Sequence, residues 1–200
     1  ATTALAAARF SARAQREDGS WPYGTSRRDR FCDSFHTGYT LVALNMIGQS
    51  LRTAEFDPAV QRGLDYWRKA FLIGPAVAYH PGRPYPVDAH AVAHAIVTLC
   101  VFRPWLPDGL TKARRLAAWM LSQMRDPEGF FYYRRTRTRV NRIAYMRWVQ
   151  AWMLLALAEL ATADAGPDPG GFGTEAATEH TGARQSETTR HERSRSRHPR

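Results

Sequence analysis

The feature that most constrains the fold of this chain is a repeat with an interval of 55 residues. Superimposing the sequence on itself with this offset places Gly19 on Gly74 and Gly74 on Gly129, and it places Asp33 on Asp88. A repeat of about 50 residues is typical of stacked supersecondary units, because one unit alone leaves its apolar face uncovered. The sequence therefore predicts three related units that pack against one another.

Each unit predicts two helices. The first helix is amphipathic, with apolar residues at i, i+3 and i+4, whereas the second is apolar nearly all round and is expected to be buried. The first helices are predicted over residues 3–15, 58–72 and 111–124, and the second over residues 34–47, 88–102 and 144–161. Amphipathic helices outside and apolar helices inside predict an all-α fold over residues 1–165, in which three αα-hairpins form part of an (α/α) toroid.

A Gln-Gly-aromatic motif follows the first helix of the first unit and returns at residues 123–133. Gly19 comes just beyond the helix, where a left-handed turn suits glycine. Trp21 is then expected to fold back on the helix end, as a structural clasp between Gln15 and the hairpin. The alternative is that Trp21 and Tyr23 contact a ligand, and both are candidate substrate-binding residues.

Composition limits the classes of protein to which the chain can belong. Residues 166–200 contain a single large apolar side chain, Phe172, and are predicted to be a disordered tail. The net charge of +10 favours anionic partners, but no nucleic-acid-binding motif accompanies it. The longest apolar run, residues 151–158, is too short to span a bilayer. We therefore expect a cytoplasmic protein with no membrane span, no specific nucleic acid and no disulfide framework.

Carboxylates and imidazoles stand at the starts of two consecutive second helices. Asp33 and His36 precede or begin one, and Asp88, His90 and His94 do so in the next. Glycoside cleavage uses two carboxyl groups, and sugar epimerisation uses groups that exchange a proton with carbon, as His does near neutral pH. We take Asp33, His36, Asp88 and His90 as candidate catalytic residues. The alternative is that the two Asp are helix N-caps and the His are hydrogen-bonded core residues.

A basic and aromatic segment lies in the third unit. Arginine pairs bidentately with carboxylate or phosphate, and aromatic rings stack on pyranose faces. The segment is thus predicted to bind an anionic sugar, and the alternative is a solvated loop or short hairpin. The candidate substrate-binding residues in this unit are Tyr133, Arg142, Tyr145, Arg147 and Trp148.

Five segments of the chain resemble known families. Gln15-x3-Gly19-x-Trp21 resembles the Q-W repeat of squalene and terpene cyclases, and the string DSFHTGYTLVAL resembles the repeat of protein prenyltransferase β subunits. Together the segments are similar to uncharacterised squalene-cyclase-like toroid proteins linked to bacterial exopolysaccharide biosynthesis. They are residues 15–24, 33–44, 85–99, 126–134 and 141–154.

This resemblance implies the toroid fold and a carbohydrate-handling function in bacterial surface-polysaccharide biosynthesis or modification, as a glycosidase- or epimerase-like enzyme on an acidic sugar. Two alternatives stay open: a non-catalytic binding or scaffold toroid, and a terpene cyclase or prenyltransferase-like enzyme. The Asp-x-Asp-Asp string of the cyclases is absent, and no complete set of zinc ligands accompanies His36. We therefore expect no metal and no cofactor. Because three hairpins make only part of a ring, we expect the C-terminal half of a longer protein, an open arc, or one partner of an oligomer that completes the ring.

Overall fold

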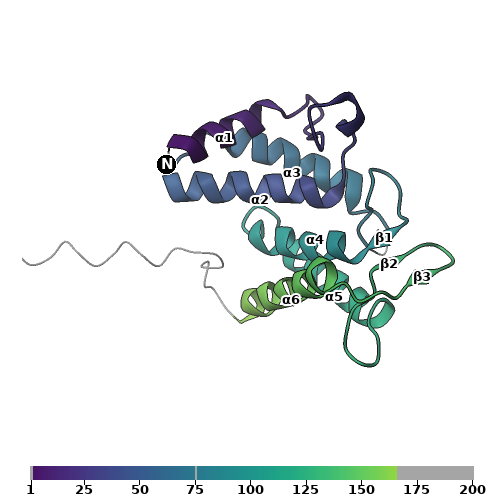
Figure 1. The fold of residues 1–200 in the computed structure, drawn as a ribbon. Coiled ribbons are helices and arrows are strands. Elements are labelled where there is room, and N and C mark those ends of the chain that lie inside the picture. The colour runs from purple at the N-terminus through teal and green to yellow at the C-terminus, as the bar shows by residue number, and fades with distance from the viewer. Residues whose placement is uncertain (1, 75, 166–200) are drawn as a thin grey trace, which may run out of the picture.

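The computed structural model describes residues 2–74 and 76–165 (Figure 1). The predicted disordered tail, residues 166–200, lies outside the described residues. In the described part of the chain there are six α-helices and one small antiparallel sheet. The alternation of amphipathic and apolar helices that the repeat predicts is confirmed. The amphipathic helices are α1 Thr2–Arg13, α3 Asp57–Phe71 and α5 Gly109–Gln123, and the apolar helices are α2 Ser34–Leu51, α4 Ala89–Val101 and α6 Ala151–Asp164.

The third apolar helix begins later than predicted. A π-helical turn, Met146–Gln150, precedes α6, and the N–H of Gln150 donates to the carbonyl of Tyr145 five residues earlier. Of the predicted third apolar helix, residues 144–161, only the part from Ala151 onward is therefore α-helical. A second short element, the 3₁₀ helix Arg27–Asp29, lies in the loop between α1 and α2.

The apolar helices lie next to one another in the order α2, α4, α6. Helix α4 is in the middle of the packing and contacts α2, α5 and α6, while α1 and α3 pack against α2 (Figure 1). Every residue of α4 from Ala89 to Cys100 is buried, as predicted. The same prediction is wrong for α2 and α6, because each leaves apolar side chains exposed, Met46 on α2 and Leu154 on α6. Whether this row of helices belongs to a ring stays a prediction.

A three-stranded sheet departs from the all-α prediction. Its strands are β1 Val87–Asp88, β2 Arg134–Arg135 and β3 Val140–Asn141, in the order β1-β2-β3. Strands of two residues are too short to show an alternating pattern, so β1 could not be predicted from apolar spacing. The hairpin β2–β3 agrees with the short hairpin that was one reading of the arginine-rich segment. By pairing with β1, this hairpin brings Arg134 opposite Asp88 at the start of α4.

The Gln-Gly-aromatic motif of the first unit forms the expected clasp. The amide of Gln15 donates to the carbonyl of Gly19 at 3.1 Å and to that of Ala59 in α3 at 2.8 Å. Gly19 has a φ of +87°, and a Cβ there would lie 2.4 Å from the carbonyl oxygen of Arg62. The left-handed turn and the close approach of α3 both require glycine. The motif therefore attaches the end of α1 to α3.

Candidate functional site

Asp33 and Asp88 are the N-caps of α2 and α4. One carboxylate oxygen of Asp33 accepts the backbone N–H of His36 at 2.9 Å, and one of Asp88 accepts that of His90 at 3.0 Å. Both carboxylates are buried. The capping alternative is thus right for both residues, and it leaves one oxygen of each for another partner.

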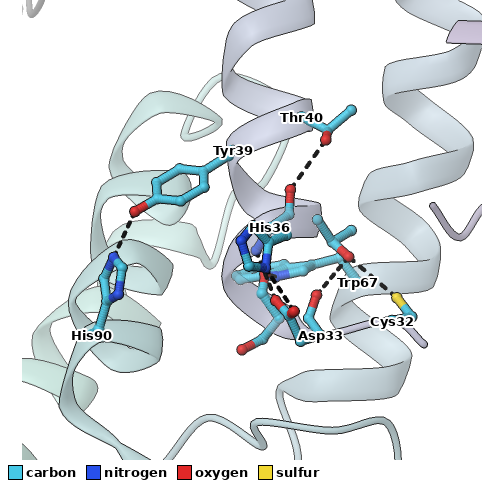
Figure 2. A network of polar contacts seen from close by, with 9 residues as sticks. Cys32, Asp33, His36, Tyr39, Thr40, Trp67 and His90 are labelled. Carbon is cyan, nitrogen blue, oxygen red and sulfur yellow. Dashed lines mark hydrogen bonds and ion pairs between the residues drawn. The ribbon is translucent and has the colours of Figure 1, made fainter. Parts of the chain in front are cut away.

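The second oxygen of Asp33 orients the imidazole of His36 (Figure 2). It lies 2.7 Å from Nδ1, and because a carboxylate only accepts hydrogen bonds, Nδ1 carries the hydrogen. The lone pair is then on Nε2. The side chain of His36 is 37% exposed, whereas that of Asp33 is fully buried. A half-exposed imidazole held in one tautomer by a buried carboxylate is suited to accept and return a proton.

The second oxygen of Asp88 forms an ion pair instead. It accepts Nε and Nη2 of Arg134 at 3.0 and 2.8 Å, and this guanidinium lies over the rings of Tyr79 and Tyr133. Burial raises the pKa of Asp88, and the hydrogen bonds and positive charge of Arg134 oppose that shift. Asp88 is therefore a cap and an ion-pair partner, which differs from the free catalytic carboxyl group that the sequence predicted.

Replacing Arg134 by Gln is expected to destabilise the protein by about 2–3 kcal/mol, since it leaves the buried Asp88 carboxylate without its counter-ion. Urea unfolding followed by circular dichroism measures the change. The matched control is Arg135→Gln, because the partly buried Arg135 donates to the carbonyl of Gln123 and has no buried carboxylate as a partner, so it should contribute less than about 0.5 kcal/mol. Equal effects of the two substitutions would contradict the role given to the Asp88–Arg134 pair.

Five aromatic rings form a continuous series, here called the ring row. Tyr23 contacts His36 with ring centroids 4.5 Å apart, His36 contacts Phe35 at 4.1 Å, Phe35 contacts His90 at 4.6 Å, and His90 contacts Trp148 at 4.8 Å. The two ends are half exposed, Tyr23 at 51% and Trp148 at 48%, whereas Phe35 and His90 are buried. The ring row thus connects the loop before α2 with α2, α4 and the π-helical turn.

Tyr39, His94 and Trp152 lie against the buried part of the ring row. The hydroxyl of Tyr39 is 2.5 Å from Nε2 of His90, and its ring meets that of His94 at 4.1 Å (Figure 2). Gly38 permits this packing, because a Cβ there would lie 2.6 Å from Nδ1 of His94. Burial lowers the pKa of His90 to about 4 and that of His94 to about 3. Both imidazoles are consequently neutral at pH 7.

The structure brings together about half of the predicted site. Tyr23, His36, His90 and Trp148 share the ring row, and Asp33 supports it. Asp88 and Tyr133 form a neighbouring cluster with Arg134, and Tyr145 packs on Tyr133 at 5.1 Å. This cluster adjoins the ring row through Tyr79, which contacts Phe35 at 5.7 Å.

Three predicted residues lie elsewhere. Trp21 is only 6% exposed and packs in the core, where Nε1 donates to the carbonyl of Ser11. Arg142 is exposed and lies over the ring of Tyr132 instead of beside the ring row. Arg147 is exposed on the π-helical turn. The structure thus places Trp21 as a core residue, in agreement with the clasp rather than with substrate binding.

Five residues of the site were not among the predicted site residues. Phe35 and Tyr39 could have been found, because they follow Asp33 on the same helix and stand one turn apart. The others depend on contacts between distant segments. The five residues are Phe35, Tyr39, Tyr79, Arg134 and Trp152.

The ring row is a surface feature with a buried centre. Two hollows on the described part of the chain, of about 370 and 320 Å³, contain none of its residues; the larger is lined by Tyr66 and charged side chains that include those of α3, and the smaller by residues that include the end of α2. Within residues 2–74 and 76–165, no group of three or more His, Cys, Asp or Glu side chains is arranged to hold a metal ion.

No helix in the described ranges combines the length and apolar character needed to cross a bilayer. Comparisons of the chain with protein-family models, with curated proteins and with solved structures gave no match.

Proposed function

We propose that the chain belongs to an (α/α) toroid that binds an anionic carbohydrate across the ring row, and that the Asp33–His36 pair exchanges a proton with it. The observation that carries the proposal is the ring row itself, with exposed aromatic rings at both ends and an oriented imidazole between them. The resemblance to toroid proteins of bacterial exopolysaccharide biosynthesis supports the same substrate class and a cytoplasmic role.

The basic character of the protein favours an acidic sugar. Tyr23 and Trp148 offer exposed rings to pyranose faces, and the exposed Arg147 precedes Trp148 in the sequence. The net charge of +10 adds a general attraction for anions. A uronic acid residue within an oligosaccharide offers both a pyranose face for the aromatic rings and a negative charge for the basic protein.

The geometry favours proton exchange with carbon over two-carboxylate glycoside cleavage. Glycoside hydrolysis needs a pair of carboxyl groups that both act on the glycosidic bond. Here one carboxylate, Asp88, is committed to Arg134, and the other, Asp33, to orienting His36. His36 then serves as the base of an epimerase-like reaction: its Nε2 takes the proton from the carbon, and a proton from solvent water delivered to the opposite face inverts that carbon.

A non-catalytic binding or scaffold toroid is the second candidate. It is favoured by the exposed apolar side chains of α2 and α6, among them Met46 and Leu154, which would suit further helices of a ring or an oligomer. Aromatic rings also suit the cations of a terpene cyclase or prenyltransferase-like enzyme. That third candidate would need the acidic string or zinc ligands that this chain does not contain.

Tyr23→Ala and Trp148→Ala are each expected to weaken binding of trigalacturonate about 10-fold, because each removes one stacking ring. Isothermal titration calorimetry measures the change, with neutral maltotriose as the comparison ligand. Phe10→Ala is the matched control, since Phe10 is an equally exposed aromatic residue on α1. Absence of saturable binding to the wild-type protein would overturn the proposal. Binding without any conversion of the sugar, in the wild type as in His36→Gln, would favour the scaffold.

A further inference from the structure

His90 is a buried imidazole with one unpartnered nitrogen. The residue is 1% exposed, and Nε2 is hydrogen-bonded to the hydroxyl of Tyr39. Among the residues that the structure describes, Nδ1 has no hydrogen-bond partner. Leaving a buried polar group unpaired is destabilising, and such groups are rare in native proteins. The position of this nitrogen therefore points to a partner that is not part of the described chain.

The unpartnered nitrogen is a hydrogen-bond donor. Among the described residues, the Tyr39 hydroxyl has Nε2 of His90 as its hydrogen-bond partner. Burial raises the pKa of the Tyr39 phenol and so keeps it protonated. We assign the hydroxyl as the donor to Nε2 because the described residues offer it no other acceptor, and this assignment places the hydrogen of the neutral ring on Nδ1. An N–H group in this position requires an acceptor oxygen.

Trp148 covers His90 on the exposed side of the ring row. The rings of Phe35 and Trp152 lie at small angles to the imidazole, 32° and 30°, whereas Trp148 meets it at 73° with centroids 4.8 Å apart. Trp148 is itself half exposed and belongs to a π-helical turn, an element often found at functional sites. In Figure 2, the free nitrogen of His90 lies on the side of the ring that faces Asp33 and His36.

We infer that Trp148 covers a ligand subsite whose buried anchor is the Nδ1–H of His90, and that a hydroxyl or carboxylate oxygen of the sugar accepts this hydrogen bond when the indole moves aside. The inference rests on the proposed function and adds a specific contact to it. His36 and His90 lie on either side of Phe35, at 4.1 and 4.6 Å. One imidazole then exchanges the proton while the other binds the oxygen.

Two measurements test the subsite. In protein labelled with ¹⁵N-histidine, trigalacturonate should shift the Nδ1 resonance of His90 and leave its tautomer unchanged. His90→Phe keeps the ring but removes the donor, and it should weaken trigalacturonate binding about 10-fold by calorimetry. The matched control is His80→Phe, a histidine in the loop before β1, which should bind as the wild type does.

The outcomes separate this inference from the proposed function. Wild-type binding without a shift of the His90 Nδ1 resonance, or with equal affinity in His90→Phe, would overturn the subsite and leave the proposed function in place. No binding of trigalacturonate to the wild type would overturn both. If His90→Phe does not fold, the resonance of the wild-type protein decides alone.

Discussion

Lowering the pH from 7 to 4 is expected to unfold the protein, because two buried histidines stay neutral in the folded state. Burial lowers the pKa of His90 to about 4 and that of His94 to about 3. In the unfolded chain both titrate near their ordinary pKa of about 6.5. Below that pH the unfolded state binds protons that the folded state does not, so stability present above pH 6.5 is lost as the pH falls toward 4.

The loss is large on the scale of protein stability. Each histidine contributes about 1.4 kcal/mol per pH unit in this window, which gives about 6 kcal/mol for the two between pH 6.5 and 4. Small domains have about 5–15 kcal/mol in total. Asp88 has the opposite effect on stability. Because its pKa is raised in the folded state, the folded state takes up a proton before the unfolded state does as the pH falls, and this offsets part of the lost stability.

Urea midpoints measured between pH 7.5 and 4.5 by tryptophan fluorescence test this expectation. His94→Gln should reduce the pH dependence by about half, because Gln removes one of the two titrating groups and keeps an amide near Thr98. His80→Gln is the control and should retain the wild-type dependence. A pH profile of His94→Gln equal to that of the wild type would show that the burial of this imidazole does not govern acid stability.

The helices could be predicted because their signals are local. Apolar spacing along α3 or α5 depends on residues within the same helix, and these helices begin and end within a few residues of the prediction. The π-helical turn before α6 could not be predicted, since apolar spacing does not distinguish a bond to the fourth preceding residue from one to the fifth. It ends at Gln150, whose amide exchanges two hydrogen bonds with the backbone of Phe131.

Part of the site could be predicted because some of its residues are also close together in the sequence. The Asp33–His36 pair lies within one helical turn, so its chemistry could be seen in the sequence. Asp88 is equivalent to Asp33 in the repeat, but the same offset places His36 on Ala91, so Asp88 has no histidine at this spacing. Its partner, Arg134, is 46 residues away and reaches it through the pairing of β1 with β2. No pattern in the local sequence predicts the pairing of these two strands.

Replacing Trp21 by Ala is expected to destabilise the protein by about 3–5 kcal/mol, as for other buried aromatic residues. The ring packs over Gly63 of α3, where a Cβ would lie only 2.2 Å from Cζ3 of Trp21, and its N–H donates to the carbonyl of Ser11 in α1 at 2.8 Å. The substitution therefore opens a cavity between α1 and α3 and removes one of the hydrogen bonds that the Ser11 carbonyl accepts, the other coming from the N–H of Ala14.

Thermal unfolding by calorimetry measures the effect of Trp21→Ala, and Trp148→Ala supplies the comparison. Because Trp148 is half exposed, its removal should cost less than about 1 kcal/mol while it weakens trigalacturonate binding. Trp21→Ala should do the reverse, with a large loss of stability and wild-type affinity in the fraction that stays folded. If Trp21→Ala melts like the wild type but no longer binds trigalacturonate, Trp21 belongs to the binding site and its role as a clasp between α1 and α3 is wrong.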